Sequence, residues 1–168
     1  MVTLHVLSAV LLIGPFALAA FAGHRAIRRR DADDTADAAR WMARAAIGSV
    51  LVALLGFGAL GTSDRFGFGT PWVVISITLW LVVMGVATGY TVPALRKAAK
   101  LLEAESMENP PKVNDPEGPV PTVPASAEDL ALRGRLDAVA GRIIGSGTVV
   151  LLGLVVITVL MTLRPFGK

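Results

Sequence analysis

LHVLSAVLLIGPFALAAFAGH, residues 4–24, is an apolar run with a histidine near each end. Its length matches the roughly 20 residues that a helix needs to cross a hydrocarbon core about 30 Å thick. No lysine or arginine precedes the run and the cations come after it, so we expect a retained membrane span rather than a cleaved signal peptide. The stretch therefore predicts an integral membrane protein.

Three further apolar blocks follow, separated by charged stretches. Of the 168 residues, 54% are hydrophobic and 17% are charged, and the mean hydropathy is +0.63. Each block is about as long as one membrane crossing. The sequence predicts an all-α integral membrane four-helix bundle that forms a single domain over residues 1–168. The expected transmembrane spans are about 2–23, 45–62, 72–95 and 143–163.

The connectors between the blocks differ in composition. The first, residues 24–44, is rich in arginine, aspartate and alanine, which predicts a short interfacial helix. Residues 63–71, SDRFGFGTP, predict a tight turn, and Pro93 predicts a kink late in the third span. Residues 103–129 contain six prolines and almost no large apolar side chain, so we expect a disordered cytoplasmic linker there.

Lysine and arginine are unevenly distributed between the connectors. Six arginines lie in the first connector and six cations lie between residues 96 and 135, whereas the turn between the second and third spans has only Arg65. The positive-inside rule therefore predicts a multi-pass protein of the bacterial cytoplasmic membrane with both termini outside, an N-out/C-out topology. We expect the cations beside the apolar blocks to contact lipid headgroups rather than nucleic acid.

Some chemistries are excluded or disfavoured by composition. The chain has no cysteine, which excludes disulfides, thiolate metal sites and cysteine nucleophiles. The four blocks carry no Asp, Glu, Lys or Arg at central depth, which disfavours a proton-driven transporter. Arg133 and Asp137 are four residues apart before the fourth block, so we expect them to form a surface ion pair.

Small residues recur at four-residue spacing in two blocks. The pairs are Gly85 with Gly89 and Gly141 with Gly145. Such pairs let helix backbones approach closely. We expect them to make packing contacts inside the bundle, with a homodimer face as the alternative.

The two histidines are the candidate cofactor ligands. A four-helix membrane bundle can hold b-type haem between axial histidines, and His5 lies one turn into the first span. Because 19 residues separate His5 from His24, the two lie about 28 Å apart along a helix and cannot ligate one iron. Met161, in the same half of the fourth span, is the candidate second ligand. The simpler interpretation makes His5 a structural interfacial residue and His24 an anchor or a solvated residue.

Three stretches carry a family resemblance: LHVLSAVLLIGPFALAAF at 4–21, TPWVVISITLWLVVM at 70–84 and ITVLMTLRP at 157–165. They resemble a family of predicted bacterial integral membrane proteins, the domain of unknown function 2269 type. The opening histidine and Gly14 also look like the first helix of copper-resistance D-type membrane proteins and of haem-binding HemJ-type protoporphyrinogen oxidases. In the latter a first-helix histidine is functionally important, and the matching residue here is His5.

Three functions are compatible with these features. The first is a non-enzymatic accessory or scaffold subunit, whose partners are other membrane proteins or a second copy. The second is a haem or porphyrin protein in electron transfer or tetrapyrrole chemistry that uses His5. The third is a small-solute or metal transporter, in which His5 and Met161 form an outer entry site.

Overall fold

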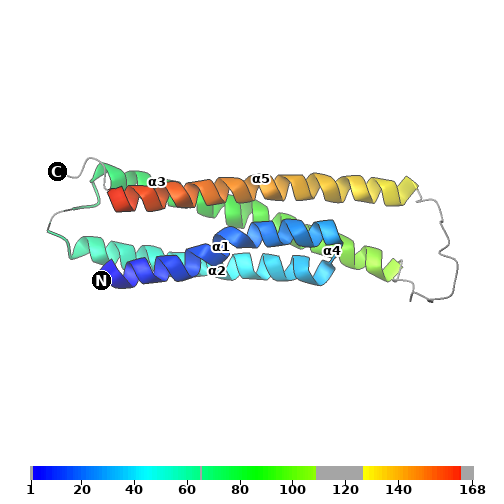
Figure 1. The fold of residues 1–168 in the computed structure, drawn as a ribbon, viewed down its shortest axis with the longest axis horizontal. Helices are drawn as coiled ribbons and strands as arrows, with labels where there is room; N and C mark the ends of the chain where they lie inside the picture. The colour runs from blue at the N-terminus through cyan, green and yellow to red at the C-terminus, as the bar shows by residue number, and fades with distance from the viewer. Residues whose placement is uncertain (1, 65, 109–126, 164–168) are drawn as a thin grey trace.

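The computed structural model describes residues 2–64, 66–108 and 127–163, and its regular elements there are all helices. They are α1 (Val2–Arg29), α2 (Ala32–Gly61), α3 (Pro71–Val86), the π-helix η1 (Ala87–Thr91), α4 (Val92–Glu108) and α5 (Ala127–Leu163). Because α3, η1 and α4 follow one another without a break, the elements form four rods (Figure 1). The predicted all-α four-helix architecture is confirmed.

Four helical stretches are long and apolar enough to cross a membrane. They are Thr3–Arg29, Ala32–Gly61, Pro71–Met107 and Leu130–Leu163. The expected spans fall inside these stretches to within a residue. All four rods also run well beyond the expected spans, into the charged connectors.

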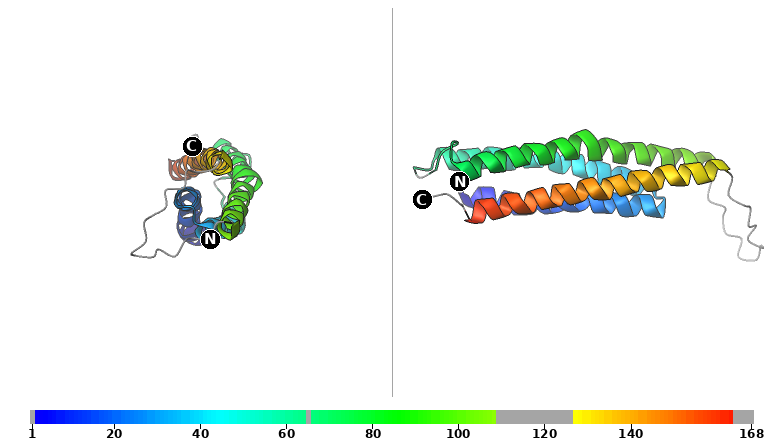
Figure 2. Two further views of the ribbon diagram at one scale, coloured as in Figure 1. Left: turned by 90° about the vertical axis from the view of Figure 1, so that its right-hand side faces the viewer. Right: turned by 90° about the horizontal axis from the view of Figure 1, so that it is seen from above.

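The rods close into a ring. α1 contacts α2 and α5, α2 contacts α4, and α3 contacts α5, so each rod packs against its two neighbours (Figure 2). The start of α1, the α2–α3 turn and the end of α5 lie at one end of the bundle (Figure 1). The α1–α2 turn lies toward the other end.

The connection between α1 and α2 is a two-residue turn. Arg30 has φ 57°, and its N–H donates to the Ile27 carbonyl at 3.0 Å while the Asp31 N–H donates to the Ala26 carbonyl at 3.1 Å. This pattern is a Schellman motif with a non-glycine residue in the left-handed position. Asp31 then caps α2 by accepting the Asp34 N–H at 2.8 Å. The separate interfacial helix expected in residues 24–44 is wrong, because its residues continue α1 and α2.

The bend expected at Pro93 takes the form of the π-helix η1. Proline has no N–H, and its ring clashes with the carbonyl four residues earlier, so an α-helix cannot continue regularly into it. The Val92 N–H donates to the Ala87 carbonyl, five residues back. The wider turn absorbs the lost α-helical hydrogen bond.

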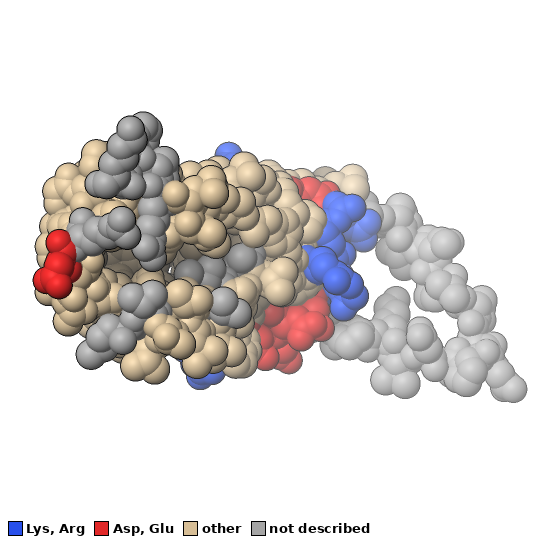
Figure 3. All heavy atoms as spheres, turned by 60° about the vertical axis from the view of Figure 1, so that its left-hand side comes forward, with Lys and Arg blue, Asp and Glu red and all other residues tan. Residues whose placement is uncertain are grey.

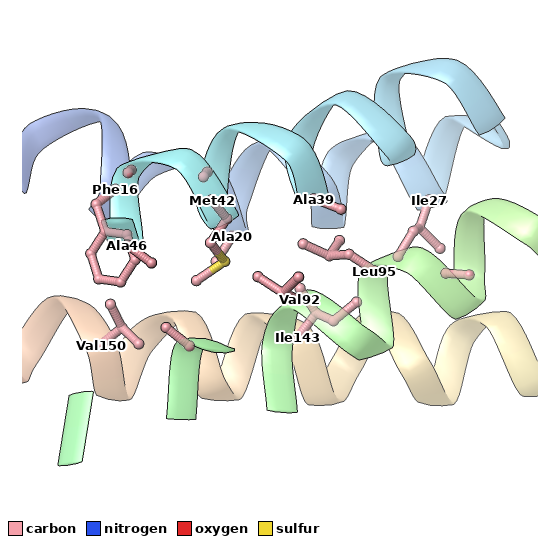
Figure 4. Close-up of a cluster of buried hydrophobic side chains, with 14 of the residues drawn as sticks. Phe16, Ala20, Ile27, Ala39, Met42, Ala46, Val92, Leu95, Ile143 and Val150 are labelled. Atoms are coloured by element: carbon pink, nitrogen blue, oxygen red, sulfur yellow. The ribbon is translucent and has the colours of Figure 1, made fainter. Parts of the chain in front are cut away.

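The core is narrow and contains many small side chains. Its largest fully buried residues include Phe16, Met42, Leu95, Ile143 and Val150 (Figure 4). Around them α1 and α5 approach closely: a Cβ atom added at Gly147 would lie 2.6 Å from the Ala20 Cβ. Only glycine fits at this contact.

The outer surface of the rods is apolar. Leu11 and Ile47 are 63% and 74% exposed, and many other large hydrophobic side chains are exposed with them. Lysine and arginine gather toward the end of the bundle that holds the α1–α2 turn (Figure 3). An exposed apolar surface with cations gathered toward one end (Figure 3) is typical of a lipid-facing bundle.

The segment expected to be a linker is only partly described. α4 continues to Glu108 and α5 begins at Ala127, so helices extend into both ends of residues 103–129. Residues 109–126 lie outside the described residues, and disorder there stays a prediction.

Candidate functional site

His5 is half-buried and its ring is turned toward α2. Its Nδ1 atom lies 2.9 Å from the carbonyl oxygen of Val52. Since a carbonyl oxygen only accepts, Nδ1 carries the proton of this bond, and in the neutral tautomer Nε2 is the ring's acceptor. The ring also occupies the space beside Gly56, where an added Cβ would lie 2.8 Å from the His5 Cε1 atom. His5 therefore joins α1 to α2.

Met161 lies on α5 and is 38% exposed. The contacts that fix the His5 ring come from α2 instead. In the described ranges, no group of three or more His, Cys, Asp or Glu residues could hold a metal ion. Ligation of one haem by His5 and Met161 stays a prediction. Its support comes from His5 alone.

His24 makes the corresponding bond at the other end of α1. Its Nδ1 atom lies 3.0 Å from the carbonyl oxygen of Ala140 on α5. Because α1 is continuous from Val2 to Arg29, the two histidines are separated by about 28 Å of helix. The expectation that they form no common site follows from this geometry. A link from His24 to α5 was missed, because the sequence does not indicate which helix faces it.

Two polar contacts join helices inside the bundle, one of them buried and one part-buried. Thr91 in η1 donates through Oγ1 to the Ser146 Oγ on α5 at 2.9 Å, and the Ser49 Oγ lies 3.0 Å from the Met84 sulfur. Most other hydroxyls in the spans donate to a carbonyl of their own helix, as expected. Those that donate to the carbonyl one turn back include Ser8, Ser76, Thr78, Thr88, Thr148 and Thr158.

The charged end of the bundle holds ion pairs between helices. Arg28 of α1 pairs with Asp137 of α5 at 3.0 Å, and Arg30 pairs with Glu105 of α4. The structure thus gives Asp137 a partner on another helix, in place of the expected Arg133. Arg133 lines a cavity of about 280 Å³ together with Arg28, Arg30 and Asp137. Sequence spacing alone favoured the partner on the same helix.

The glycine pairs do not pack inside the bundle as expected. A Cβ atom added at any of the four would meet nothing within 4 Å, and all four residues are exposed: Gly85, Gly89, Gly141 and Gly145. The glycines that do make close contacts are Gly23, Gly48, Gly56, Gly147 and Gly153. These four glycines face out of the bundle, and the alternative of a homodimer face stays a prediction.

The four apolar helices and the cation-rich end (Figure 3) define a multi-span helical membrane protein. The model of the family described as "Predicted integral membrane protein (DUF2269)" matches residues 1–115, so the chain belongs to that family. The match confirms the first resemblance and covers α1 to α4. The chain matches no curated protein and no solved structure.

Proposed function

We propose that this protein is a non-enzymatic accessory subunit that packs a transmembrane helix of a partner protein against α5. The observation that carries the proposal is the open glycine face at Gly141 and Gly145. In a bilayer, helices gain little hydrophobic energy from contacting each other, so close backbone approach at small residues drives their association. An exposed pair of this type supports a contact with another chain.

The small-residue face is longer than one pair. Gly134, Ala138, Gly141, Gly145 and Thr148 follow one another at spacings of three or four, and all five are exposed. At 1.5 Å per residue, the 14-residue interval from Gly134 to Thr148 measures about 21 Å. Because the fourth span is expected to begin near residue 143, a partner helix would contact this face at the charged end of the bundle and in the adjoining part of the membrane.

A second open pair supports the same role. Gly85 lies near the end of α3 and Gly89 lies in η1, and both are exposed with nothing within 4 Å of an added Cβ. Thr88, between them, is exposed and donates its hydroxyl to the Met84 carbonyl at 2.7 Å. Two separate rods therefore present outward small residues, as a subunit that joins two neighbours requires.

Site-specific crosslinking in native membranes tests the proposal. A photoreactive residue at Thr148 should crosslink to one defined partner, either another membrane protein or a second copy. The matched control is the same residue at Gly58, which is also exposed and open but lies on α2. Equal, diffuse labelling from both positions would refute an α5 interface.

Haem binding through His5 is the second candidate function. The bond from Nδ1 to the Val52 carbonyl favours it, because that bond leaves Nε2 as a free ring acceptor in a fixed orientation. A bound haem would supply one-electron chemistry, and His5 would be its axial ligand. Protein purified from haem-replete cells should then have a Soret band that His5→Ala abolishes and His24→Ala retains. A wild-type protein without this band would eliminate the idea.

A further inference from the structure

A groove of about 570 Å³ runs between α1 and α2 on the outside of the bundle. Its apolar part is lined by Pro15, Leu18 and Ala22 of α1. The part nearer the α1–α2 turn is lined by charged residues of both helices. Leu18 is 66% exposed, so the apolar wall is open to the surroundings of the bundle.

The charged part of the groove carries both signs. Arg25 and Arg29 come from one face of α1, and Asp34 and Asp37 come from the first two turns of α2. Two cations and two anions give this part a formal charge of zero. Across the described residues, no ion pair joins these arginines to these aspartates, and Asp37 instead pairs with Arg40 on its own helix. Among the described residues Arg25, Arg29 and Asp34 thus have no ion-pair partner, and together with the Asp37 carboxylate, which also contacts Arg40, they can bind a ligand that carries both charges.

The groove has the dimensions of one lipid leaflet. From Pro15 to Arg25 the helix rises about 15 Å, which is half of the roughly 30 Å hydrocarbon core. Trp41 lines the charged part and is 60% exposed. An exposed tryptophan at this level is typical of the headgroup region.

We propose that this groove binds a zwitterionic aminophospholipid, phosphatidylethanolamine. The phosphate contacts Arg25 and Arg29, the primary ammonium contacts Asp34 and Asp37, and one acyl chain lies along Pro15, Leu18 and Ala22. Each contact matches opposite charges, and the ammonium donates hydrogen bonds that the carboxylates accept.

Related headgroups fit the charges less well. Phosphatidylglycerol satisfies the arginines but brings no cation for the aspartates, so Asp34 stays unpaired and Asp37 keeps only Arg40. Phosphatidylcholine has the same net charge, but its trimethylammonium has no N–H to donate. The cavity beside Arg133 differs, because three arginines and one aspartate line it and it favours an anion. A preference for one headgroup therefore distinguishes binding in the α1–α2 groove from non-selective binding of anionic lipid at the cationic end.

Native mass spectrometry of the delipidated, full-length protein tests the proposal. The protein is mixed with equal amounts of phosphatidylethanolamine, phosphatidylcholine and phosphatidylglycerol with identical acyl chains. We expect about fivefold more bound phosphatidylethanolamine than either competitor, since one charge-assisted hydrogen bond is worth that ratio or more. Equal retention of the three lipids by the wild-type protein would overturn the proposal.

Paired charge variants assign the preference to this groove. Asp34→Asn with Asp37→Asn should shift retention toward phosphatidylglycerol, and Arg25→Gln with Arg29→Gln should abolish selective retention. Arg96→Gln with Lys97→Gln removes two exposed charges from α4 and should leave the preference unchanged. Arg40→Gln breaks the pair with Asp37 but keeps the carboxylate, and it should retain or increase the preference.

A variant of the apolar wall tests the binding of the acyl chain separately from the headgroup. Leu18→Trp fills the apolar wall without changing a charge, and it should lower retention of all three lipids at this site. Circular dichroism of each variant identifies any that fails to fold. An unchanged preference for phosphatidylethanolamine in the folded Asp34→Asn, Asp37→Asn double variant would contradict the assignment.

Discussion

The Nδ1 atom of His5 donates to the carbonyl oxygen of Val52 across 2.9 Å. The bond joins α1 to α2 near the end of the bundle where the chain begins (Figure 1). His5, the candidate haem ligand, is thus also a residue that packs α1 against α2. Its structural role can be tested separately from any ligand.

Gly56→Ala should destabilise the protein by displacing His5. The added Cβ would lie 2.8 Å from the His5 Cε1 and 3.1 Å from Nδ1, so the ring must move and its bond to Val52 weakens. We expect a loss of about 1 kcal/mol in the free energy of unfolding. Unfolding in mild detergent, followed by circular dichroism, measures it.

The control for this prediction is Gly58→Ala on the same helix. A Cβ there would meet nothing within 4 Å, and alanine has the higher helix propensity. Stability should be unchanged or slightly higher. Equal destabilisation by both substitutions would show that the contact with His5 is not the cause.

Gly147→Ala should force α1 and α5 apart. The added Cβ would lie 2.6 Å from the Ala20 Cβ, and a methyl group on a helix has no rotamer that avoids the clash. We expect a loss of about 1–3 kcal/mol in the free energy of unfolding. Gly145→Ala, two residues away and open to the outside, should leave the monomer's stability unaltered. The account of α1–α5 packing fails if the two variants unfold alike.

Arg30 should tolerate glycine better than alanine. Both substitutions remove the ion pair with Glu105, but only glycine relieves the left-handed backbone, φ 57°, at the end of α1. The glycine variant should be more stable than the alanine variant by about 1 kcal/mol. Thermal unfolding of the two proteins side by side measures the difference, and a more stable alanine variant would contradict the Schellman assignment.

Cysteine labelling tests the predicted topology without background, because the chain has no cysteine. Lys168→Cys should react with a membrane-impermeant thiol reagent in intact cells. Asp33→Cys, in the first turn of α2, should react only after the membrane is permeabilised. The reverse pattern would place the arginine-rich end outside and overturn the positive-inside prediction.

Span number and approximate span bounds could be predicted from sequence because hydropathy and length are local properties. The block at residues 4–24 needs no partner to be recognised as a crossing. An irregularity near Pro93 could also be predicted, as a kink, since the missing N–H and the ring clash are local; the π-helix itself was not predicted. The hydrogen bond from Thr91 in η1 to Ser146 on α5 joins residues 55 positions apart, which no single segment encodes.

The partners of side chains could not be predicted in the same way. Asp137 pairs with Arg28, 109 residues earlier in the chain, because α1 and α5 lie side by side. The glycine pairs were expected inside because their spacing is identical for an internal and an external helix contact. Orientation about the helix axis, set by the larger neighbours Ile143 and Val150, decides between the two.

The native mass of the protein extracted from its own membranes in mild detergent tests the subunit role most directly. The wild-type chain should be part of a complex larger than its 17.6 kDa monomer. Gly145→Leu, which fills the open face of α5, should release a folded monomer, whereas Gly58→Leu should retain the complex. A wild-type protein that is monomeric, or a complex that Gly145→Leu leaves intact, would contradict an α5 partner interface.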